Sequence, residues 1–592
     1  MCGISALYRF TNISSNDCLK LEAMNKEMAY RGPNEKGVWH DDICGLAHTR
    51  LSIIGLENGH QPIFNEDRSL VLVCNGEIYN YKDLRSSLKQ KGHLFSTDSD
   101  SEVIIHLYEE YGIDALQHLR GMFAFCLWDS NINRLFSARD RVGEKTLYFS
   151  QLPTGVIFST ELKAILKYYI SKPQINIKSL AEAIRYNFPI DLRNTYIEQI
   201  KRLQAGEYAL VDADGIQLHT YWKKHQSKVF DGSKEEAKQE VLRLMRESVS
   251  NCLQSDVPVA VLLSGGIDSS AIAAFARECR KDVHVITAGY KGKFDCDERE
   301  VARQFAKEKD LIYHEVELDV NDFKNLFDEY IEYIDEPVCD VSSISQWALY
   351  KKAKALGFTV LLGGIGGDEL FYGYPYYNRL ANAYMLRKQH YDLLPWKGKK
   401  KDYLKFVLHN LKPILFAGYP MKLDDSIPVH WTYDDYRKFA KDAKLYLNCE
   451  VEEFESVDVH FSFAEDTNID AVYDFMFTRF MNTQCLYLAD RLGMGNSVEI
   501  RSPFVDYKIV EFVSTLPVFV KYDEKCPKRF LKDALYGILP DYILYAQKKG
   551  FTPPFDFINQ LNKEYEYKCI KSLHTFYNSM LADKLISLLI KP

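Results

Sequence analysis

The fold of most of this chain is decided by the run VPVAVLLSGGIDSS at residues 257–270. Its first half is an apolar stretch with the length of a buried strand, and the small residues 271–274 continue it as a helix. Three further apolar strands, at 284–290, 311–318 and 358–362, alternate with helix-like segments. This alternation predicts an α/β doubly wound parallel sheet with crossover helices. Ligands of such sheets bind at the carboxyl ends of the strands.

The end of the run, residues 264–270, predicts a phosphate-binding loop. Small residues let a backbone approach a phosphate closely, and amides at the start of the following helix point at the anion. Asp268 would hold a magnesium ion there. For a bare Gly-Gly pair, a simple turn between strand and helix is the alternative. The full run resembles the pyrophosphate loop of ATP pyrophosphatases, which cleave ATP between its α and β phosphates. This resemblance implies ATP binding by Leu263, Ser264, Gly265, Gly266, Asp268, Ser269 and Ser270.

A second glycine-rich turn, GGIGGDE at residues 363–369, follows the strand that ends at residue 362. Because both loops leave the same edge of the predicted sheet, Asp368 is placed to share the metal ion with Asp268. The resemblance adds Gly364 to the ATP-binding residues.

The start of the chain, Met1-Cys2-Gly3-Ile4, carries a candidate nucleophile. If the methionine is removed, Cys2 has both a thiol and a free α-amine. The amine, with an unperturbed pKa of about 7.7 to 8.0, can take the thiol proton while the thiol attacks a carbonyl. A cysteine at the second position also occurs by chance, so this feature alone does not establish catalysis.

Four short motifs follow Cys2 in order: RGP at 31–33, RLSI at 50–53, NGEIYN at 75–80 and SDSE at 99–102. Together with Cys2 they resemble the glutaminase domain of class II, N-terminal nucleophile (Ntn), amidotransferases. The resemblance implies an α+β Ntn sandwich in which two antiparallel sheets lie between helices.

These motifs supply the residue types that glutamine hydrolysis needs. The planar fork of Arg50 matches an α-carboxylate, while Glu77 and Asp100 could pair with the ammonium of the same amino acid. Asn75 and the backbone amide of Gly76 lie where a strand gives way to a turn, and could donate to an oxyanion. The resemblance implies the same roles. Read singly, an Asn-Gly pair is most often a turn and a lone Arg a surface charge.

The glutaminase-like domain is predicted to span residues 1–215. A polar stretch follows it, and Ser233 with Glu236 forms a capping box that opens a helix. We place a second domain, of the asparagine-synthetase type, at residues 233–592. One face of its first helix carries, at helical spacing, Val241, Leu244, Met245, Ser248, Val249 and Cys252.

The second domain carries further motifs at residues 335–337, 340–343, 490–491, 499–506 and 548–551. With the two loops they resemble the synthetase domain of glutamine-hydrolysing asparagine synthetases. When the glutaminase-like part is included, this resemblance covers most of the chain. It implies that Lys548 steadies charge on the activated intermediate and on the departing pyrophosphate. Read individually, Asp490 and Glu499 are ordinary members of buried ion pairs.

Ile365 departs from the family pattern, which has Glu at this point of the turn. An alkyl side chain neither accepts a proton nor binds an ammonium. Another group therefore supplies the base, or attack by ammonia needs none, or the acceptor is not aspartate. Residues 375–489 carry no recognised motif, and they could reshape the acceptor site or form surface helices without catalytic consequence.

Composition is typical of an intracellular enzyme of two or more domains, with 592 residues, 46% apolar and 26% charged. The formal net charge of −8 argues against a nucleic-acid-binding surface. Because the sequence has no membrane-length apolar stretch and no signal-peptide pattern at the N-terminus, we expect a cytoplasmic protein. The 13 cysteines lack paired metal-ligand spacing and are expected to be reduced thiols.

We therefore expect a ligase that uses glutamine, ATP and Mg²⁺ to convert a carboxylate into an amide. Asparagine synthesis from aspartate through an acyl-adenylate is the first hypothesis. Amidation of another carboxylate, such as a uronic acid of a surface-polysaccharide precursor, is the second, and Ile365 with residues 375–489 motivates it. A sensor without catalysis is the third, and the joint presence of Cys2, both aspartates and Lys548 argues against it. The expected partners are these small molecules, with no nucleic acid and no membrane, and a homodimer stays possible.

Overall fold

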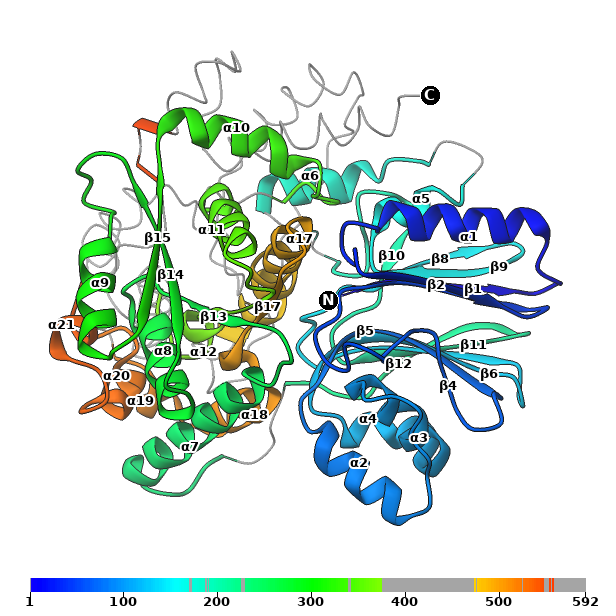
Figure 1. The fold of residues 1–592 in the computed structure, drawn as a ribbon, viewed down its shortest axis with the longest axis horizontal. Helices are drawn as coiled ribbons and strands as arrows, with labels where there is room; N and C mark the ends of the chain where they lie inside the picture. Colours follow the sequence, from blue (N-terminus) through cyan, green and yellow to red (C-terminus); the bar gives the residue numbers. More distant parts are fainter. Residues whose placement is uncertain are drawn as a thin grey trace, which may run out of the picture.

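Two lobes lie side by side in the computed structural model (Figure 1). The N-terminal lobe comprises residues 2–220, and the C-terminal lobe comprises the described residues from 234 onward. The structure describes residues 2–169, 173–186, 189, 191–224, 229–338, 342–374, 473–474, 476–523, 525–547, 553–554 and 556–557.

Two six-stranded antiparallel sheets build the N-terminal lobe. The first has the order β10-β8-β9-β1-β3-β2, with β1 (Gly3–Arg9), β2 (Glu35–His40), β3 (Cys44–Arg50), β8 (Tyr148–Leu152), β9 (Gly155–Ser159) and β10 (Lys201–Arg202). The second has the order β12-β11-β7-β6-β5-β4, with β4 (Ile63–Phe64), β5 (Leu70–Ile78), β6 (Gly121–Asp129), β7 (Arg134–Arg139), β11 (Glu207–Asp212) and β12 (Gly215–Thr220). The prediction of two antiparallel sheets is confirmed.

The two sheets pack face to face, with helices on their outer faces (Figure 1). Residues that alternate along β1, such as Ile4 and Ala6, share one buried cluster with Val71 and Val73 of the facing sheet. Helices α1 (Ser15–Glu27) and α5 (Leu162–Leu166) cover the first sheet. The second is covered by α2 (Tyr81–Gln90), α3 (Val103–Tyr111) and α4 (Ala115–His118), with the short 3₁₀ turns η1 (Asp100–Glu102) and η2 (Gly112–Asp114); α6 (Ile177–Tyr186) lies toward the other lobe.

A five-stranded parallel sheet of order β15-β14-β13-β16-β17 forms the centre of the C-terminal lobe. Its strands are β13 (Val259–Leu262), β14 (His284–Tyr290), β15 (Ile312–Leu318), β16 (Val360–Leu362) and β17 (Glu499–Arg501). All four predicted strands are present, and the doubly wound parallel sheet is confirmed.

Helices cover both faces of this sheet. The evidence is that alternate residues along its strands belong to different apolar clusters. Val259 and Val261 of β13 pack with one cluster, whereas Ala260 packs with the other. The first cluster includes α7 (Lys234–Cys252), α8 (Ile267–Cys279), α9 (Arg299–Glu308), α18 (Tyr507–Thr515), α20 (Arg529–Leu535) and α21 (Asp541–Leu544). The second includes α10 (Val320–Ile331), α11 (Ser343–Ala355) and α17 (Leu486–Gly495). The remaining elements are α12 (Gly367–Leu370), the π-helix η3 (Met476–Cys485), the 3₁₀ turn η4 (Pro503–Val505) and α19 (Val518–Lys521).

The strand order places the two predicted glycine-rich loops next to each other. The chain runs from β13 outward to β14 and β15, and then returns to place β16 on the other side of β13. The boundary between β13 and β16 is therefore the topological switch point, where ligands of open α/β sheets bind.

The capping box predicted the start of the first helix of this lobe correctly. The Ser233 side chain accepts from the backbone N–H of Glu236, and the Glu236 carboxylate accepts from the N–H of Ser233. All six residues expected on the apolar face of α7 are buried. Strand β12 pairs with β11 up to Thr220, so the second sheet extends past residue 215; the division at 215 and 233 stays a prediction.

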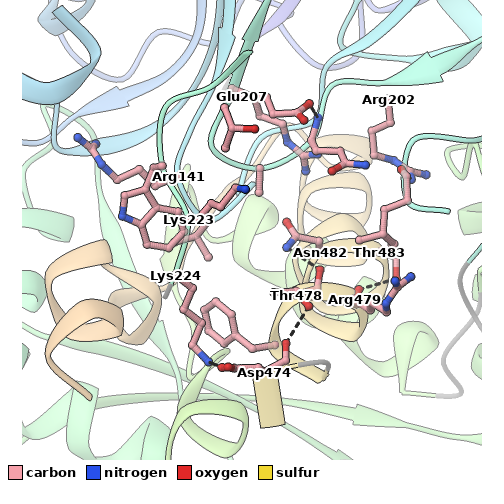
Figure 2. A pocket seen from close by; sticks show the side chains of 18 residues that line it. Arg141, Arg202, Glu207, Lys223, Lys224, Asp474, Thr478, Arg479, Asn482 and Thr483 are labelled. Carbon is pink, nitrogen blue, oxygen red and sulfur yellow. Dashed lines mark hydrogen bonds and ion pairs between the residues drawn. The ribbon is translucent and has the colours of Figure 1, made fainter. Parts of the chain in front are cut away.

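A cavity of about 570 Å³ lies at the boundary of the lobes (Figure 2). Its walls come from the N-terminal lobe, including Arg139, Arg141 and Arg202, and from the segment that leads into α17, including Arg479 and Asn482. The guanidinium of Arg139 is occupied by the backbone carbonyls of residues 143, 145 and 203. Of the predicted site residues that the structure describes, none lines this cavity.

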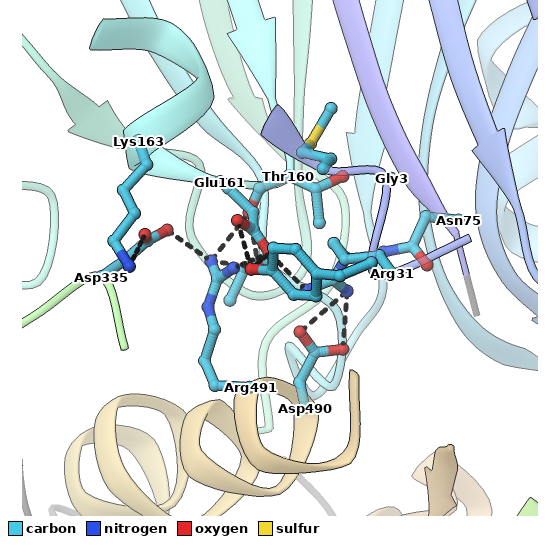
Figure 3. Close-up of polar contacts among 12 residues, drawn as sticks. Gly3, Arg31, Asn75, Thr160, Glu161, Lys163, Asp335, Asp490 and Arg491 are labelled. Atoms are coloured by element: carbon cyan, nitrogen blue, oxygen red, sulfur yellow. Dashed lines mark hydrogen bonds and ion pairs between the residues drawn. The ribbon is translucent and has the colours of Figure 1, made fainter. Parts of the chain in front are cut away.

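Buried ion pairs join the two lobes near the start of β1 (Figure 3). Arg31 of the N-terminal lobe contacts Glu161 at 3.0 Å and Asp490 of α17 at 2.9 Å. Arg491 contacts Glu161 at 2.6 Å and Asp335 at 3.1 Å. Burial raises the pKa of Asp490, but Arg31 and other cations outweigh this effect and hold the pKa below its usual value. The interpretation of Asp490 as an ion-pair residue is confirmed.

We expect Asp490→Ala to destabilise the protein strongly. Removing one member of a buried ion pair leaves its partner desolvated and costs about 3 to 5 kcal/mol, whereas an exposed pair contributes about 0 to 1 kcal/mol. Thermal unfolding followed by calorimetry measures the difference. The control is Lys351→Ala, which removes an exposed pair with Glu329. If both variants unfold at the same temperature, the ion pair does not hold the lobes together.

Candidate active site

Cys2 is held by a residue of β5 and by a residue of the turn between α1 and β2. Its backbone N–H donates to Oδ1 of Asn75 on β5 at 2.9 Å, and its carbonyl accepts from Nε of Arg31 at 2.9 Å. The side chain is only 7% exposed. Burial raises the pKa of the Cys2 thiol, while the N–H of Leu51 and the charge of Arg50 act in the opposite direction. The thiol therefore lies in a dry setting next to the end of β3.

Asn75 presents an unused donor beside this thiol-bearing residue. Its Oδ1 is occupied by the Cys2 backbone, whereas its Nδ2 is buried and has no hydrogen-bond partner among the described residues. Buried donors are nearly always paired, so an unpaired one next to a candidate nucleophile calls for a ligand. This arrangement fits a hydrogen bond to a developing oxyanion.

Gly76 follows Asn75 on β5 and pairs with Phe123 of β6. A Cβ at this position would lie 2.1 Å from the carbonyl oxygen of Met122. Only glycine fits this approach, and it sets the path of β5 at the predicted oxyanion site.

Glu77 and Asp100 lie together at the end of β5. Asp100 accepts from the backbone N–H of Ile78 at 2.6 Å, and Glu77 lies 3.3 Å from Arg501 of β17. Burial raises the pKa of Asp100 to about 6 and that of Glu77 well above its usual value. Two desolvated carboxylates at one place suit an ammonium group, and their role as its binding site stays a prediction. Glu499 lies 2.6 Å from Arg501 in the same network, which confirms its interpretation as an ion-pair residue.

Arg50, the last residue of β3, presents its guanidinium to a carboxylate. One Nη lies 2.9 Å from Glu35, and the other donates to the carbonyls of Ile54 and Gly55 at 3.2 and 2.6 Å. The two carbonyls fix the orientation of the guanidinium, and the Glu35 carboxylate shows that it accepts an anion. His60 contacts the other oxygen of Glu35 at 2.7 Å. Sequence reasoning missed Glu35 and His60, which follow no motif.

The loop after β13 closes over the start of α8. The hydroxyl of Ser269 accepts from the N–H of Ser264 at 3.1 Å and lies 3.0 Å from the Ser264 hydroxyl. Gly265 has a φ of +80°, a conformation that favours glycine. The hydroxyl of Ser270 is buried and has no partner among the described residues. Leu263 anchors the loop, because its carbonyl accepts from the hydroxyl of Thr287 at 2.6 Å.

Asp268 and Asp368 meet at the switch point of the sheet, although they come from different loops. Lys528 lies between them, with its ammonium 2.5 Å from Asp268 and 2.7 Å from Asp368. Burial lowers the pKa of Lys528, but the two carboxylates outweigh it and raise the pKa above its usual value. The two aspartates therefore bind a cationic group, the ammonium of Lys528.

Glycines keep the space around these two carboxylates open. A Cβ at Gly367 would lie 2.3 Å from Oδ1 of Asp268, and one at Gly373 would lie 1.9 Å from Oδ1 of Asp368. Gly364 packs against the first turn of α8, where its Cβ would lie 3.0 Å from the Cβ of Asp268. Two carboxylates in a glycine-lined cradle beside a phosphate-type loop form a donor set that fits Mg²⁺.

Of the remaining residues that the sequence analysis singled out, the structure describes Ile365 but not Lys548. Lys548 lies outside the described residues, as do residues 375–472. Ile365 is partly buried and packs against both apolar clusters of the sheet. Lys528 was missed, because a single lysine in a stretch without a motif gives no signal of its partners.

The two sites flank one apolar core. Leu51, which follows Arg50, and Met122, which contacts Gly76, belong to the same buried cluster as Leu263 and Val505 of the C-terminal lobe. The interface that joins the lobes therefore runs from the Cys2 site toward the loop after β13.

Two family models together cover most of the chain. The model of the glutamine amidotransferase domain matches residues 1–222, and the model of asparagine synthase matches residues 240–579. The asparagine synthetase [glutamine-hydrolyzing] 1 of Bacillus subtilis is 30% identical, over 90% of this chain and 84% of that protein. The chain belongs to the family of glutamine-hydrolysing asparagine synthetases.

Of two further relatives, one carries the same family name and the other carries a different name. A putative glutamine-hydrolysing asparagine synthetase of Mycobacterium bovis is 31% identical, over 89% of this chain and 83% of that protein. A protein of Gibberella zeae named amidase chry2 is 27% identical, over 94% of this chain and 89% of that protein. The synthetase is thus an enzyme of the glutamine-dependent amidotransferase and ligase type, and its family uses ATP.

Within the described parts of the chain, the synthetase has no helix with the length and apolar character needed to cross a membrane.

We expect Lys528→Met to make the synthetase more responsive to Mg²⁺. Without the ammonium, Asp268 and Asp368 repel each other, and a divalent cation relieves this repulsion. A gain of about 1 kcal/mol corresponds to about 2 to 4 °C in unfolding temperature for domains of this size. Thermal unfolding with and without Mg²⁺, in the absence of nucleotide, measures it.

The matched control is Lys525→Met, an exposed lysine three residues away. An equal Mg²⁺ shift in the wild type and both variants would show that the two aspartates do not form a cation site.

Proposed function

We propose that this synthetase transfers the amide nitrogen of glutamine to a carboxylate that it first activates with ATP, and that the acceptor is aspartate. The observation that carries the proposal is the apolar core shared by the two sites, with Leu51 on one side and Leu263 on the other. Two sites joined through a dry interface suit the transfer of a small neutral nucleophile. We retain residues 1–215 and 233–592 as the two domains of this scheme.

In the first site, Cys2 attacks the side-chain carbonyl of glutamine. After removal of Met1, the α-amine of Cys2 takes the thiol proton. Nδ2 of Asn75 and the N–H of Gly76 stabilise the oxyanion. When this intermediate collapses, its C–N bond breaks, ammonia leaves with the proton held by the α-amine, and a thioester remains. Water then hydrolyses the thioester to glutamate and the free thiol. Support comes from the unpaired buried Nδ2 of Asn75 beside Cys2.

The same site recognises the two charged ends of glutamine. Arg50 binds the α-carboxylate in place of Glu35, and Glu77 with Asp100 binds the ammonium. The contact between Arg50 and Glu35 at 2.9 Å and the burial of Glu77 and Asp100 side by side support this assignment.

In the second site, residues 263–270 with Gly364 bind ATP. Asp268 and Asp368 would hold Mg²⁺, which when bound supplies neutralisation of phosphate charge. Lys528 already contacts both aspartates and contributes a further positive charge, and Lys548 is proposed to stabilise the departing pyrophosphate. The acceptor carboxylate attacks the α-phosphorus, pyrophosphate leaves, and ammonia displaces AMP from the acyl-adenylate.

Ammonia reaches the second site through the interface of the lobes. In bulk water most of it would be protonated and would lose its nucleophilic lone pair. The buried side chains of Leu51, Met122 and Val142 pack in one cluster with those of Leu263 and Val505, which favours the neutral molecule.

A specific observation favours a second candidate acceptor. Ile365 stands where the family has Glu, and its side chain packs against apolar clusters, where it can neither act as a base nor bind a charge. An acceptor other than aspartate, such as a uronic acid of a surface-polysaccharide precursor, is therefore the alternative.

We expect Cys2→Ala to lose amide formation from glutamine and to keep amide formation from added ammonium salts. The loss with glutamine should exceed a thousandfold, because the nucleophile is removed while the second site is unchanged. Amide product is measured with each nitrogen source. Cys279→Ala, which removes an exposed thiol, is the control and should keep both activities. Loss of both activities in Cys2→Ala contradicts the two-site scheme.

Pyrophosphate release identifies the acceptor. We incubate the enzyme with ATP, Mg²⁺, glutamine and one acid at a time, including aspartate, glutamate and uronic acids. Release with aspartate alone supports asparagine synthesis, and release with a sugar acid alone supports the alternative. Asp268→Asn should abolish release while glutamine hydrolysis continues. Absence of release with every acid would leave a sensor as the better description.

A further inference from the structure

A cluster of imidazoles and carboxylates lies outside both sites, beside the helices that cover the second sheet. Glu66, His93 and His106 each offer one ligand atom, and these atoms all lie within 4.8 Å of one another. The three residues come from separate segments: the turn between β4 and β5, the loop after α2, and α3.

Glu109 brings the two imidazoles to a common point. Its Oε2 lies 3.2 Å from Nδ1 of His93 and 2.8 Å from Nδ1 of His106. Its other oxygen accepts from Nδ2 of Asn65 at 2.9 Å, so the carboxylate is held in orientation. Glu66 is held in the same way, because one of its oxygens accepts from the N–H of Leu94 at 2.9 Å. The second oxygen of Glu109, Oε2, is thereby kept toward both imidazoles.

Further carboxylates lie behind the imidazoles. Nε2 of His93 lies 3.1 Å from Glu110, and Nε2 of the fully buried His106 lies 3.8 Å from Glu102. The hydrogen bond between Nε2 of His93 and Glu110 favours the tautomer with the proton on that nitrogen, which leaves the Nδ1 lone pair of His93 for a metal ion. Glu102 acts on His106 through its charge, because 3.8 Å is too long for a hydrogen bond. Metal-binding histidines usually have such an outer partner.

The carboxylates around the two imidazoles favour the binding of a cation. The ring centroids of His93 and His106 are 4.9 Å apart, so two protonated rings would repel each other. Four carboxylates surround the pair, from residues 66, 102, 109 and 110. A single divalent ion balances the two carboxylates that face the imidazoles, those of Glu66 and Glu109.

We propose that His93, His106, Glu66 and Glu109 bind a divalent transition metal ion, with Zn²⁺ as the best match. Two imidazole nitrogens and two carboxylate oxygens are a ligand set that Zn²⁺ takes in tetrahedral geometry. Bonds of about 2.0 to 2.1 Å place such ligand atoms about 3.3 Å apart. The separations of 2.8 and 3.2 Å around Glu109 come close to this geometry, and short side-chain movements complete it.

The ion has a structural role in the N-terminal lobe. It joins α3 to two loops, and it fixes the environment of Glu102, which accepts hydrogen bonds from the backbone N–H groups of Ser96 and Thr97. The segment so anchored ends at the turn η1, which carries Asp100. The metal site therefore stabilises the part of the chain that presents a candidate glutamine-binding carboxylate.

Metal binding by the full-length enzyme tests the proposal. Protein stripped with a chelator is titrated with Zn²⁺ by calorimetry, and Co²⁺ absorption is recorded as a spectroscopic substitute. We expect His93→Ala and Glu66→Gln to bind one equivalent fewer than the wild type. The Co²⁺ spectrum lost in these variants should lack thiolate charge transfer, since the site contains no cysteine. Zn²⁺ should raise the unfolding temperature of the wild type more than that of either variant.

The matched control is His118→Ala, an exposed imidazole that stacks on Tyr111 and lies outside the cluster. It should bind as much Zn²⁺ as the wild type. Both substituted ligands are at least partly exposed, so the variants should fold, which circular dichroism checks. Equal stoichiometry in the wild type and both ligand variants would overturn the proposal, as would the same loss in His118→Ala.

Discussion

The buried guanidinium of Arg31 is the interaction on which the arrangement of the lobes depends. It contacts the carbonyl of Cys2, the carboxylate of Glu161 and the carboxylate of Asp490. Cys2, the proposed nucleophile, is thereby tied to α17 of the other lobe. Such a group is costly to bury alone, so it holds its partners in one geometry. The position of Cys2 and the contact between the lobes are consequences of the same interaction.

The second constraint is the order of the strands in the parallel sheet. Because β16 lies on the opposite side of β13 from β14, the loops that follow β13 and β16 open at one edge. Asp268 and Asp368 therefore share Lys528. Between this edge and Cys2, Arg501 and the shared apolar core fill the interface. The proposed sites of activation and of ammonia release lie on either side of this apolar contact.

Most of the fold could be predicted from the sequence because its signals are local. The strands around residues 259–262 and 284–290 and the capping box at Ser233 depend on neighbouring residues only. The glutaminase motifs all lie in one lobe, so their order along the sequence was enough to assign them to one site. Glu35 and Lys528 could not be found in this way. Glu35 meets Arg50 only because β2 pairs with β3, and Lys528 meets two aspartates that lie more than 150 residues before it in the sequence.

The sequence by itself determined the elements, the two lobes and the chemical types of the candidate residues, since periodicity, caps and loop motifs are written in short stretches. Only the tertiary structure decided which charges meet. The convergence of Arg31 with Asp490, of Arg501 with Glu77, and of His93 with His106 depends on how lobes and helices pack. The physical reason is that a buried charge must find its partner in space, and spacing along the chain does not encode that distance.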